Sequence, residues 1–193
     1  SPPAFMDREK DPEDPGELRQ GFTIFTADWN QSFAGPLKNA ALSAVGVPVY
    51  EHVNTQFGQL NHMNFASKLY LLLYDTDIDF MVSTGSSRTT RYGFDFSRNI
   101  TTNLEIHGEL ARINNFNLNT INAQGVGTTR QWNAVSYLLG LRYLSPQETT
   151  YIFEYYHNGT GVTQNQFQDF VTFTNNSYET FLGTGNDSGL NRA

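Results

Sequence analysis

Three side chains that could bind a metal ion or transfer a proton alternate along one short stretch, at Glu105, His107 and Glu109. Successive residues of a β-strand point to opposite sides, so these three would share one face of a strand. Same-face neighbours lie about 6.6 Å apart, which is too stretched for all three to reach one zinc ion easily. We therefore expect no metal site and no cofactor.

Nucleophilic catalysis has no better support in this chain. A hydrolytic site needs a serine, a histidine base beside it and an acidic or amide group that orients the base. No serine has an evident base at its side, and the other histidines, His52, His62 and His157, fall in or next to predicted loops. We expect that the chain is not an enzyme.

The elements that carry these residues are strands in which polar and apolar side chains alternate with a period of two. The pattern is clear in residues 76–84, 91–97 and 104–110, and each such strand has one charged and one oily surface. The predicted charged surface contains Asp77, Asp79, Arg91, Asp95, Glu105, His107, Glu109, Arg142 and Glu154, together with Lys68. The oily surface is rich in aromatic residues, namely Tyr92, Phe94, Phe96, Tyr137, Tyr143, Tyr151, Phe153 and Tyr155.

Such alternation fits either a membrane β-barrel or a soluble antiparallel sandwich. Three features favour the barrel. Several aromatic residues fall near strand ends, as in an interfacial girdle. The strands are about 8–12 residues long, near the ~9–11 that a tilted crossing of the hydrocarbon needs. Short and long connections alternate, as in outer-membrane barrels. We predict an all-β, antiparallel, up-and-down transmembrane barrel.

Composition excludes several other classes. The longest apolar run, residues 69–74, is far below the ~18 residues of a transmembrane helix. A net charge of -7 argues against nucleic-acid binding, and the absence of cysteine excludes disulfides. The mean hydropathy of -0.45 does not argue against a barrel, because half of each strand and all loops are polar.

The order of elements follows from the same pattern. We predict a polar acidic loop at 1–20, strands within 21–157, and a polar loop at 158–193 in which 170–174 is a short candidate strand. The eight strands are expected at 21–30, 40–50, 67–74, 77–84, 91–97, 102–112, 132–144 and 149–157. A long Asn-rich loop is expected at 114–130.

Neighbouring strands must keep their apolar residues on the same face of the sheet, and this requirement predicts how the strands pair. A two-residue turn at Asp75 and Thr76 would make Tyr74 and Asp77 partners. A three-residue connection at 98–100 would place Arg91 opposite His107. After a turn at 146–148, Glu154 would lie diagonal to Arg142, within reach of an ion pair.

Residues 68–79, 92–99 and 137–143 resemble a group of large, functionally uncharacterised proteobacterial barrels of the Gram-negative, outer-membrane porin type. The resemblance covers roughly residues 20–160. It implies a barrel in the bacterial outer membrane, surrounded by its lipid, and brings no catalytic motif. Because both termini would lie outside and the last residue is not aromatic, we expect an internal fragment of a larger barrel.

The predicted function is a channel for passive passage of small hydrophilic solutes or ions. Acidic residues outnumber basic ones on the charged surface, which predicts a preference for cations. Two alternatives stay open: a soluble β-sandwich that binds carbohydrate on its aromatic faces, and a structural barrel with a plugged lumen. Homo-oligomers are compatible with any of these.

Overall fold

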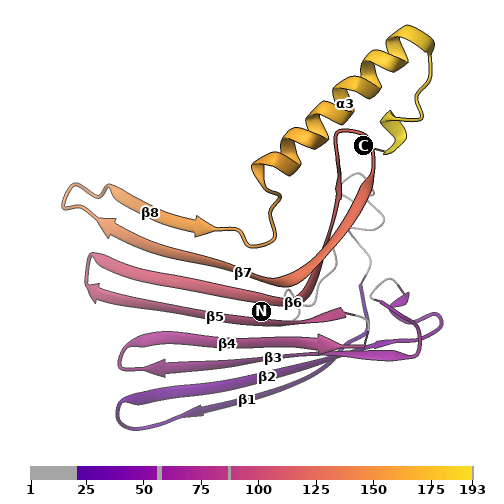
Figure 1. Cartoon of the computed structure of the whole chain (residues 1–193). Helices are drawn as coiled ribbons and strands as arrows, with labels where there is room; N and C mark the ends of the chain where they lie inside the picture. The colour runs from indigo at the N-terminus through magenta and orange to yellow at the C-terminus, as the bar shows by residue number, and fades with distance from the viewer. Residues whose placement is uncertain (1–20, 56–57, 87, 193) are drawn as a thin grey trace.

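A single antiparallel sheet of eight strands dominates the computed structural model, which describes residues 21–55, 58–86 and 88–192. Each strand pairs with its neighbours in the sequence, in the order β1 to β8 (Figure 1). The predicted all-β, up-and-down antiparallel architecture is confirmed. The strands are β1 Phe25–Ser32, β2 Leu37–Val49, β3 His62–Leu73, β4 Thr76–Gly85, β5 Arg88–Thr101, β6 Leu104–Ile121, β7 Gly127–Leu144 and β8 Thr150–His157.

The sheet is open. Within the described residues, β1 pairs only with β2 and β8 pairs only with β7. The predicted closure into a barrel is therefore not observed. The predicted acidic loop at 1–20 lies outside the described residues.

The predicted Asn-rich loop at 114–130 is wrong, because most of it extends the β6–β7 hairpin. Polar side chains pair across the two strands, with Asn117 bonded to Gln131 at 3.0 Å and Asn119 to Thr129 at 2.8 Å. At the tip, the Asn122 side chain accepts hydrogen bonds from two backbone N–H groups of its own turn. Asparagine therefore supports a hairpin here, although its low strand propensity argued for a loop.

The turn between β3 and β4 has the predicted length but lies one residue earlier. Tyr74 and Asp75 form it, with φ of 51° and 57°, and Leu73 pairs with Thr76. Two positive φ values characterise the type I′ turn, whose twist matches that of a hairpin. Consequently Asp77 lies opposite Leu72 and not opposite Tyr74.

The predicted loop after β8 is also wrong, since it contains the helix α3, Gln164–Thr184, followed by the short 3₁₀ helix η2, Leu190–Arg192. The candidate strand at 170–174 lies inside α3. A capping box of Thr163 and Gln166 begins the helix, and Gly185, with φ of 71°, ends it. Threonines within α3 bond to carbonyls four residues earlier, as Thr174 does to Phe170 at 2.9 Å, which satisfies their hydroxyls without breaking the helix.

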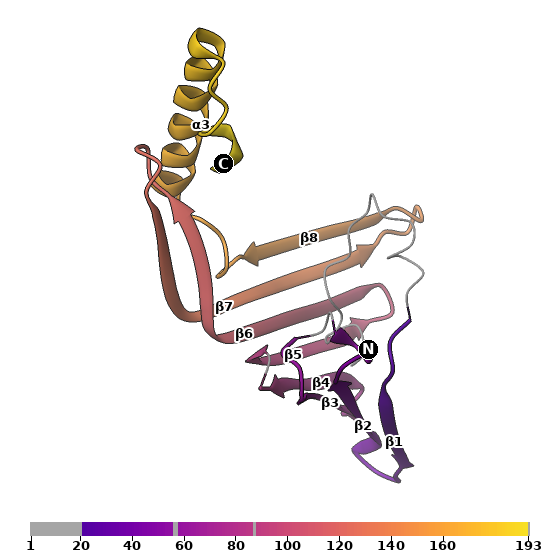
Figure 2. The same ribbon diagram turned by 90° about the vertical axis from the view of Figure 1, so that its right-hand side faces the viewer.

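The β6–β7 hairpin bends away from the rest of the sheet, and α3 lies beside its bent end (Figures 1 and 2). The register shifts between Ile113 and Phe116, where Asn115 has a φ of 50°. A bulge of this kind bends the strand that carries the extra residue. We call residues 116–132, beyond the bulge, the hairpin extension.

Candidate functional site

Strand register brings the nine residues of the predicted charged surface onto one side of the sheet. Directly opposite pairs include Asp79 with Asp95, Asp95 with Glu109, and Glu105 with Arg142. We call this side the polar face. It contains Asp77, Asp79, Arg91, Asp95, Glu105, His107, Glu109, Arg142 and Glu154, with Lys68.

Negative charge is concentrated at the centre of the polar face. Asp79, Asp95 and Glu109 form a row across β4, β5 and β6. Lys68 Nζ lies 2.7 Å from Asp79 Oδ2, whereas Asp95 and Glu109 have no ion-pair partner among the described residues. Like charges directly opposite each other destabilise a sheet. The row therefore gives this face a negative potential that its own lysine offsets only in part.

A second charged group lies on the strands β6 to β8. His107 Nδ1 is 3.6 Å from Glu105 Oε1, and His107 Nε2 is 3.5 Å from Glu154 Oε1. Arg142 Nη1 lies 3.8 Å from Glu105 Oε2. The ring can cross β7 because the residue opposite it is Gly140, where a Cβ would lie 2.0 Å from Nε2. Glycine at this position thus allows one histidine to contact carboxylates on two strands.

Of the two contacts predicted between polar-face residues, that of Arg91 with His107 is wrong, and the diagonal position of Glu154 relative to Arg142 is confirmed. Arg91 is not opposite His107, because β5 continues through residues 98–100 to Thr101; Arg91 pairs with Ile113 and Ser97 pairs with His107. Glu154 does lie diagonal to Arg142, as predicted, but its ion-pair contact is with His107.

The opposite side of the sheet, which we call the aromatic face, is apolar over β3 to β8. Its rings pack across strands, with the centroids of Phe80 and Phe94 5.3 Å apart and those of Tyr143 and Tyr151 6.5 Å apart. Many of these side chains are open to the surroundings, and Phe153 is 64 % exposed. The eight predicted girdle residues all lie on it: Tyr92, Phe94, Phe96, Tyr137, Tyr143, Tyr151, Phe153 and Tyr155.

Polarity reverses in the hairpin extension. Phe116 and Trp132 pair edge to face at 5.2 Å on the continuation of the polar face, since Trp132 follows the alternation of Ala134 and Ser136. The continuation of the aromatic face instead carries amides and hydroxyls, among them Asn117 and Asn119. The bulge therefore marks the level at which the apolar surface ends.

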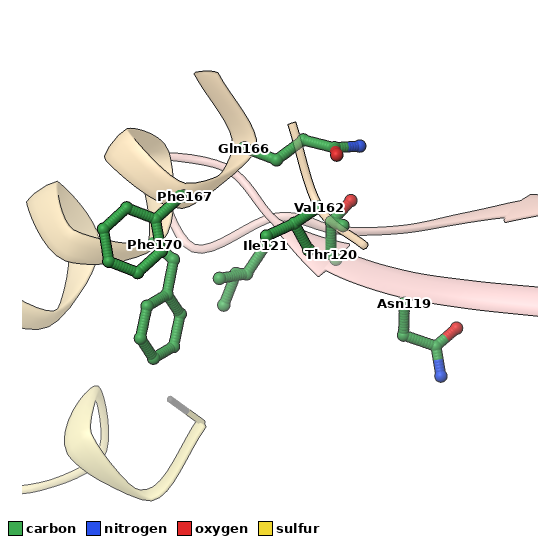
Figure 3. Close-up of a pocket in the computed structure, with 8 residues that line it drawn as sticks. Asn119, Thr120, Ile121, Val162, Gln166, Phe167 and Phe170 are labelled. Carbon is green, nitrogen blue, oxygen red and sulfur yellow. The ribbon is translucent and has the colours of Figure 1, made fainter. Parts of the chain in front are cut away.

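An apolar cavity lies between α3 and the hairpin extension, and sequence reasoning missed it (Figure 3). Its volume is about 460 Å³. Phe167 and Phe170 of α3 face Ile121 of β6, and Val162 closes one side. The pattern Thr163-x-x-Gln166 before apolar residues is a helix-start signal that could have identified this element.

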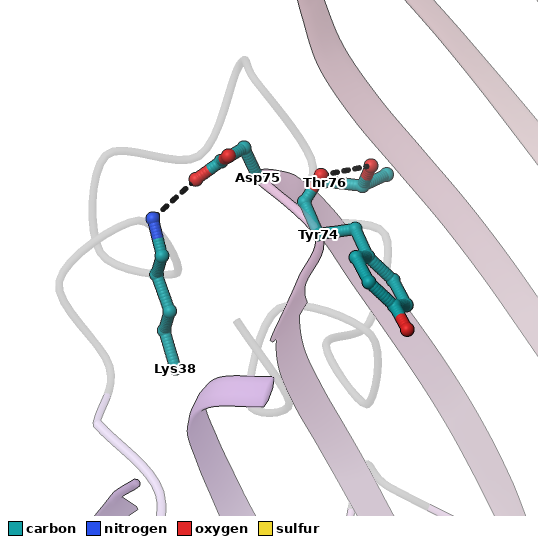
Figure 4. Close-up of polar contacts among 4 residues, drawn as sticks. All are labelled: Lys38, Tyr74, Asp75 and Thr76. Atoms are coloured by element: carbon teal, nitrogen blue, oxygen red, sulfur yellow. Dashed lines mark hydrogen bonds and ion pairs between the residues drawn. The ribbon is translucent and has the colours of Figure 1, made fainter. Parts of the chain in front are cut away.

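Ionic contact also fixes the tight turn between β3 and β4. The Lys38 ammonium donates a hydrogen bond to Asp75 Oδ1 (Figure 4). This bond, and the attraction of the same charge, lower the pKa of the Asp75 carboxyl below its ordinary value. Both groups are largely exposed, so the pair orders the turn more than it stabilises the sheet.

The described residues hold no group of three His, Asp or Glu side chains placed to bind a metal ion. Neither helix in the described part of the chain has the length and hydropathy needed to cross a membrane. The chain matches no family model, no curated protein and no solved structure.

Proposed function

We propose that the sheet forms part of the wall of an outer-membrane β-barrel channel, through which small hydrophilic solutes diffuse and which favours cations over anions. The observation that carries the proposal is the separation of the two faces. One side of the neighbouring strands β3 to β8 exposes aromatic rings, and the other carries ion pairs together with two carboxylates, Asp95 and Glu109, that have no ion-pair partner among the described residues. A barrel wall between hydrocarbon and water has this distribution.

The aromatic face is the surface for lipid. An exposed apolar area that extends over several strands is unfavourable in water and marks a surface that binds something apolar. Strand length agrees with a bilayer, since β3 and β4 have 12 and 10 residues, near the ~9–11 of a tilted crossing.

The bulge between Ile113 and Phe116 fits the upper limit of the hydrocarbon. Below it, outward residues include Leu110, Tyr137 and Leu139; above it, outward residues are amides and hydroxyls as far as Ile121, which packs against α3. Water-exposed hairpins longer than the membrane crossing are usual on the outer side of such barrels, with short turns on the other.

Open edges require a partner in this setting. Backbone N–H and C=O groups cannot stay unpaired in hydrocarbon, so only closed sheets span a membrane. The proposal therefore needs additional strands beside β1 and β8 to complete the barrel.

Cation preference follows from the carboxylate row. Asp95 and Glu109 would face the water-filled interior without an ion-pair partner among the described residues. Acidic side chains that line a pore attract cations and repel anions.

Refolding of the chain together with the strands that complete the barrel beside β1 and β8 into detergent micelles, followed by reconstitution into planar bilayers, tests the proposal. We expect heat-modifiable migration, stepwise conductance, and a reversal potential in a KCl gradient that shows cation preference. The double variant Asp95→Asn, Glu109→Gln should weaken the preference, whereas Asp75→Asn in the exposed turn should leave it unchanged. A monodisperse, water-soluble monomer would instead support the β-sandwich, and a folded species without conductance would support a plugged barrel.

A further inference from the structure

A small cavity lies on the polar face, over the strands β4 to β8, and we call it the polar-face cavity. Its volume is about 300 Å³, at the lower limit of the roughly 300–1,000 Å³ of small-molecule sites. Two neighbouring rows of directly opposite residues line it, and directly opposite residues of paired strands point to the same side of a sheet. One row forms the floor and the other forms a wall.

Small side chains form the floor of the cavity. Gly93 of β5, Ala111 of β6 and Ser136 of β7 lie directly opposite one another in the register. At the β4 end, the Met81 side chain lies over Gly93, since a Cβ on that glycine would be 3.2 Å from Met81 Cε. At the β7 end, Ser136 Oγ accepts a hydrogen bond from Gly159 N at 2.9 Å. The floor is therefore a short trough across three strands, closed at one end by a methionine.

The wall beside this trough changes from acidic to apolar along its length. Asp95 and Glu109 lie directly opposite each other on β5 and β6, and Leu138 and Tyr156 continue the row on β7 and β8. Neither carboxylate has an ion-pair partner among the described residues. Tyr156 is 60 % exposed, so its ring is accessible to a ligand. The cavity thus has an anionic end and an apolar end.

Charge and apolarity together define the ligand that would fit. Like charges directly opposite each other repel, so a cation between Asp95 and Glu109 would be favourable. Lys68 does not supply it, because its Nζ contacts Asp79 Oδ2 at 2.7 Å. An ammonium group has three N–H donors and can bond to both carboxylates at once. Small-molecule sites commonly combine apolar walls with a few polar groups of this kind.

We propose that the polar-face cavity binds a small organic cation, with the ammonium group between Asp95 and Glu109 and the apolar body against Leu138 and Tyr156. The inference deepens the proposed channel function and rests on it, in that the polar face is the side open to water. A negative potential alone attracts all cations of equal charge alike. The cavity distinguishes them by their apolar part.

Equilibrium binding in detergent provides the first test, with the chain refolded together with the strands that complete the barrel. The probe is 2-phenylethylammonium, compared by titration calorimetry with neutral 2-phenylethanol and with methylammonium, which lacks the apolar body. We expect the probe to bind at least about tenfold more tightly than either, because a hydrogen-bonded charge and a buried ring each contribute. Equal binding of 2-phenylethanol or of methylammonium would overturn the proposal.

Single variants locate the site. Asp95→Asn and Glu109→Gln should each weaken binding of the probe about tenfold, because each removes a charged acceptor. Ala111→Leu fills the trough without a change of charge and should abolish binding. The control is Asp28→Asn, which removes a carboxylate from the same face on β1 and should bind as the wild type does. Heat-modifiable migration shows that each variant is folded. An equal loss in Asp28→Asn would overturn the assignment to this cavity.

Single-channel recording separates this inference from the channel itself. The probe should block the K⁺ current of the wild type at lower concentration than that of Glu109→Gln. A folded wild type that binds the probe but does not conduct refutes the channel alone. A conducting, cation-preferring wild type that neither binds the probe nor is blocked by it refutes the binding site alone.

Discussion

The β6–β7 hairpin has two parts that obey opposite rules. Below the bulge, residues such as Leu110 and Tyr137 lie on the apolar aromatic face, and Glu109 and His107 lie on the polar face. In the hairpin extension, the continuation of the aromatic face carries amides, and Phe116 and Trp132 pair on the continuation of the polar face. Both parts have the same backbone ladder, so the strand geometry does not set the side-chain polarity.

This contrast teaches that each part is matched to different surroundings. In the proposed barrel, hydrocarbon outside and water inside would account for the lower part. In the hairpin extension the apolar side packs on protein: Trp132 Nε1 donates a hydrogen bond to the Gly159 carbonyl at 3.2 Å. On the other side Asn117 and Asn119 are exposed, and at the end of that side Ile121 packs against Phe167 and Phe170 of α3.

Adjacent leucines on opposite faces of β7 give the largest expected effect. Leu139 lies on the aromatic face and is 56 % exposed, whereas Leu138 pairs with Glu109 on the polar face. In lipid, Leu139→Arg should lower the free energy of unfolding by about 2–4 kcal/mol, the usual cost of arginine on a lipid-facing strand near the midplane. Leu138→Arg should be tolerated because it can pair with Glu109. Denaturant unfolding in vesicles measures both; equal losses would contradict the assignment of the faces.

Two glycines of β7, one on each side of the bulge, give the next effect. Gly140→Ala places a methyl group 2.0 Å from His107 Nε2 and should cost about 1–3 kcal/mol, as overpacking usually does. Gly127→Ala, in the hairpin extension, meets no atom within 4 Å and should be nearly neutral. The same unfolding assay compares them. A neutral Gly140→Ala would show that the contact of His107 with Glu154 does not depend on this glycine.

The capping box tests whether α3 is coupled to the part of the sheet below the bulge. Thr163→Ala removes the hydrogen bond from Gln166 N to Thr163 Oγ1 and should cost about 1 kcal/mol of helix stability. Hydrogen exchange should accelerate in α3 and leave β3 to β5 unchanged. The neighbouring Val162→Ala is the control for lost packing without loss of the cap. Faster exchange in β3 to β5 would mean that the two regions unfold together.

The turn pair gives the smallest effect. Because the pKa of Asp75 is lowered in the folded state, its contribution to stability is present above the ordinary pKa of 3.8 and is lost as the pH falls through the folded value. NMR titration of the Asp75 carboxyl should show this low pKa, and Lys38→Met should raise it toward the ordinary value. An unchanged pKa in Lys38→Met would exclude Lys38 as the cause.

Alternation predicted the antiparallel order and the side of each charged residue, because a period of two is a property of the strand itself. It did not predict turn positions, since moving a turn from 75–76 to 74–75, or from 98–100 to 102–103, keeps the apolar residues on the same face but changes every pairing partner. Arg91 was therefore misplaced, and the hairpin extension and α3 were mistaken for loops. Their stability comes from cross-strand amide bonds, a capping box and packing on Ile121, none of which hydropathy alternation reports.

The strictly sequential strand order has a consequence for folding. Every strand contacts its neighbours in the sequence, so each hairpin can form before the next is complete, and loop closure costs little entropy. No strand pairing within the described residues links β1 to β8, and opening at either edge breaks one ladder only. We expect protection from hydrogen exchange to rise from the outer strands toward β4 and β5, as along a chain of independent units, until closure of the sheet makes all ladders equivalent.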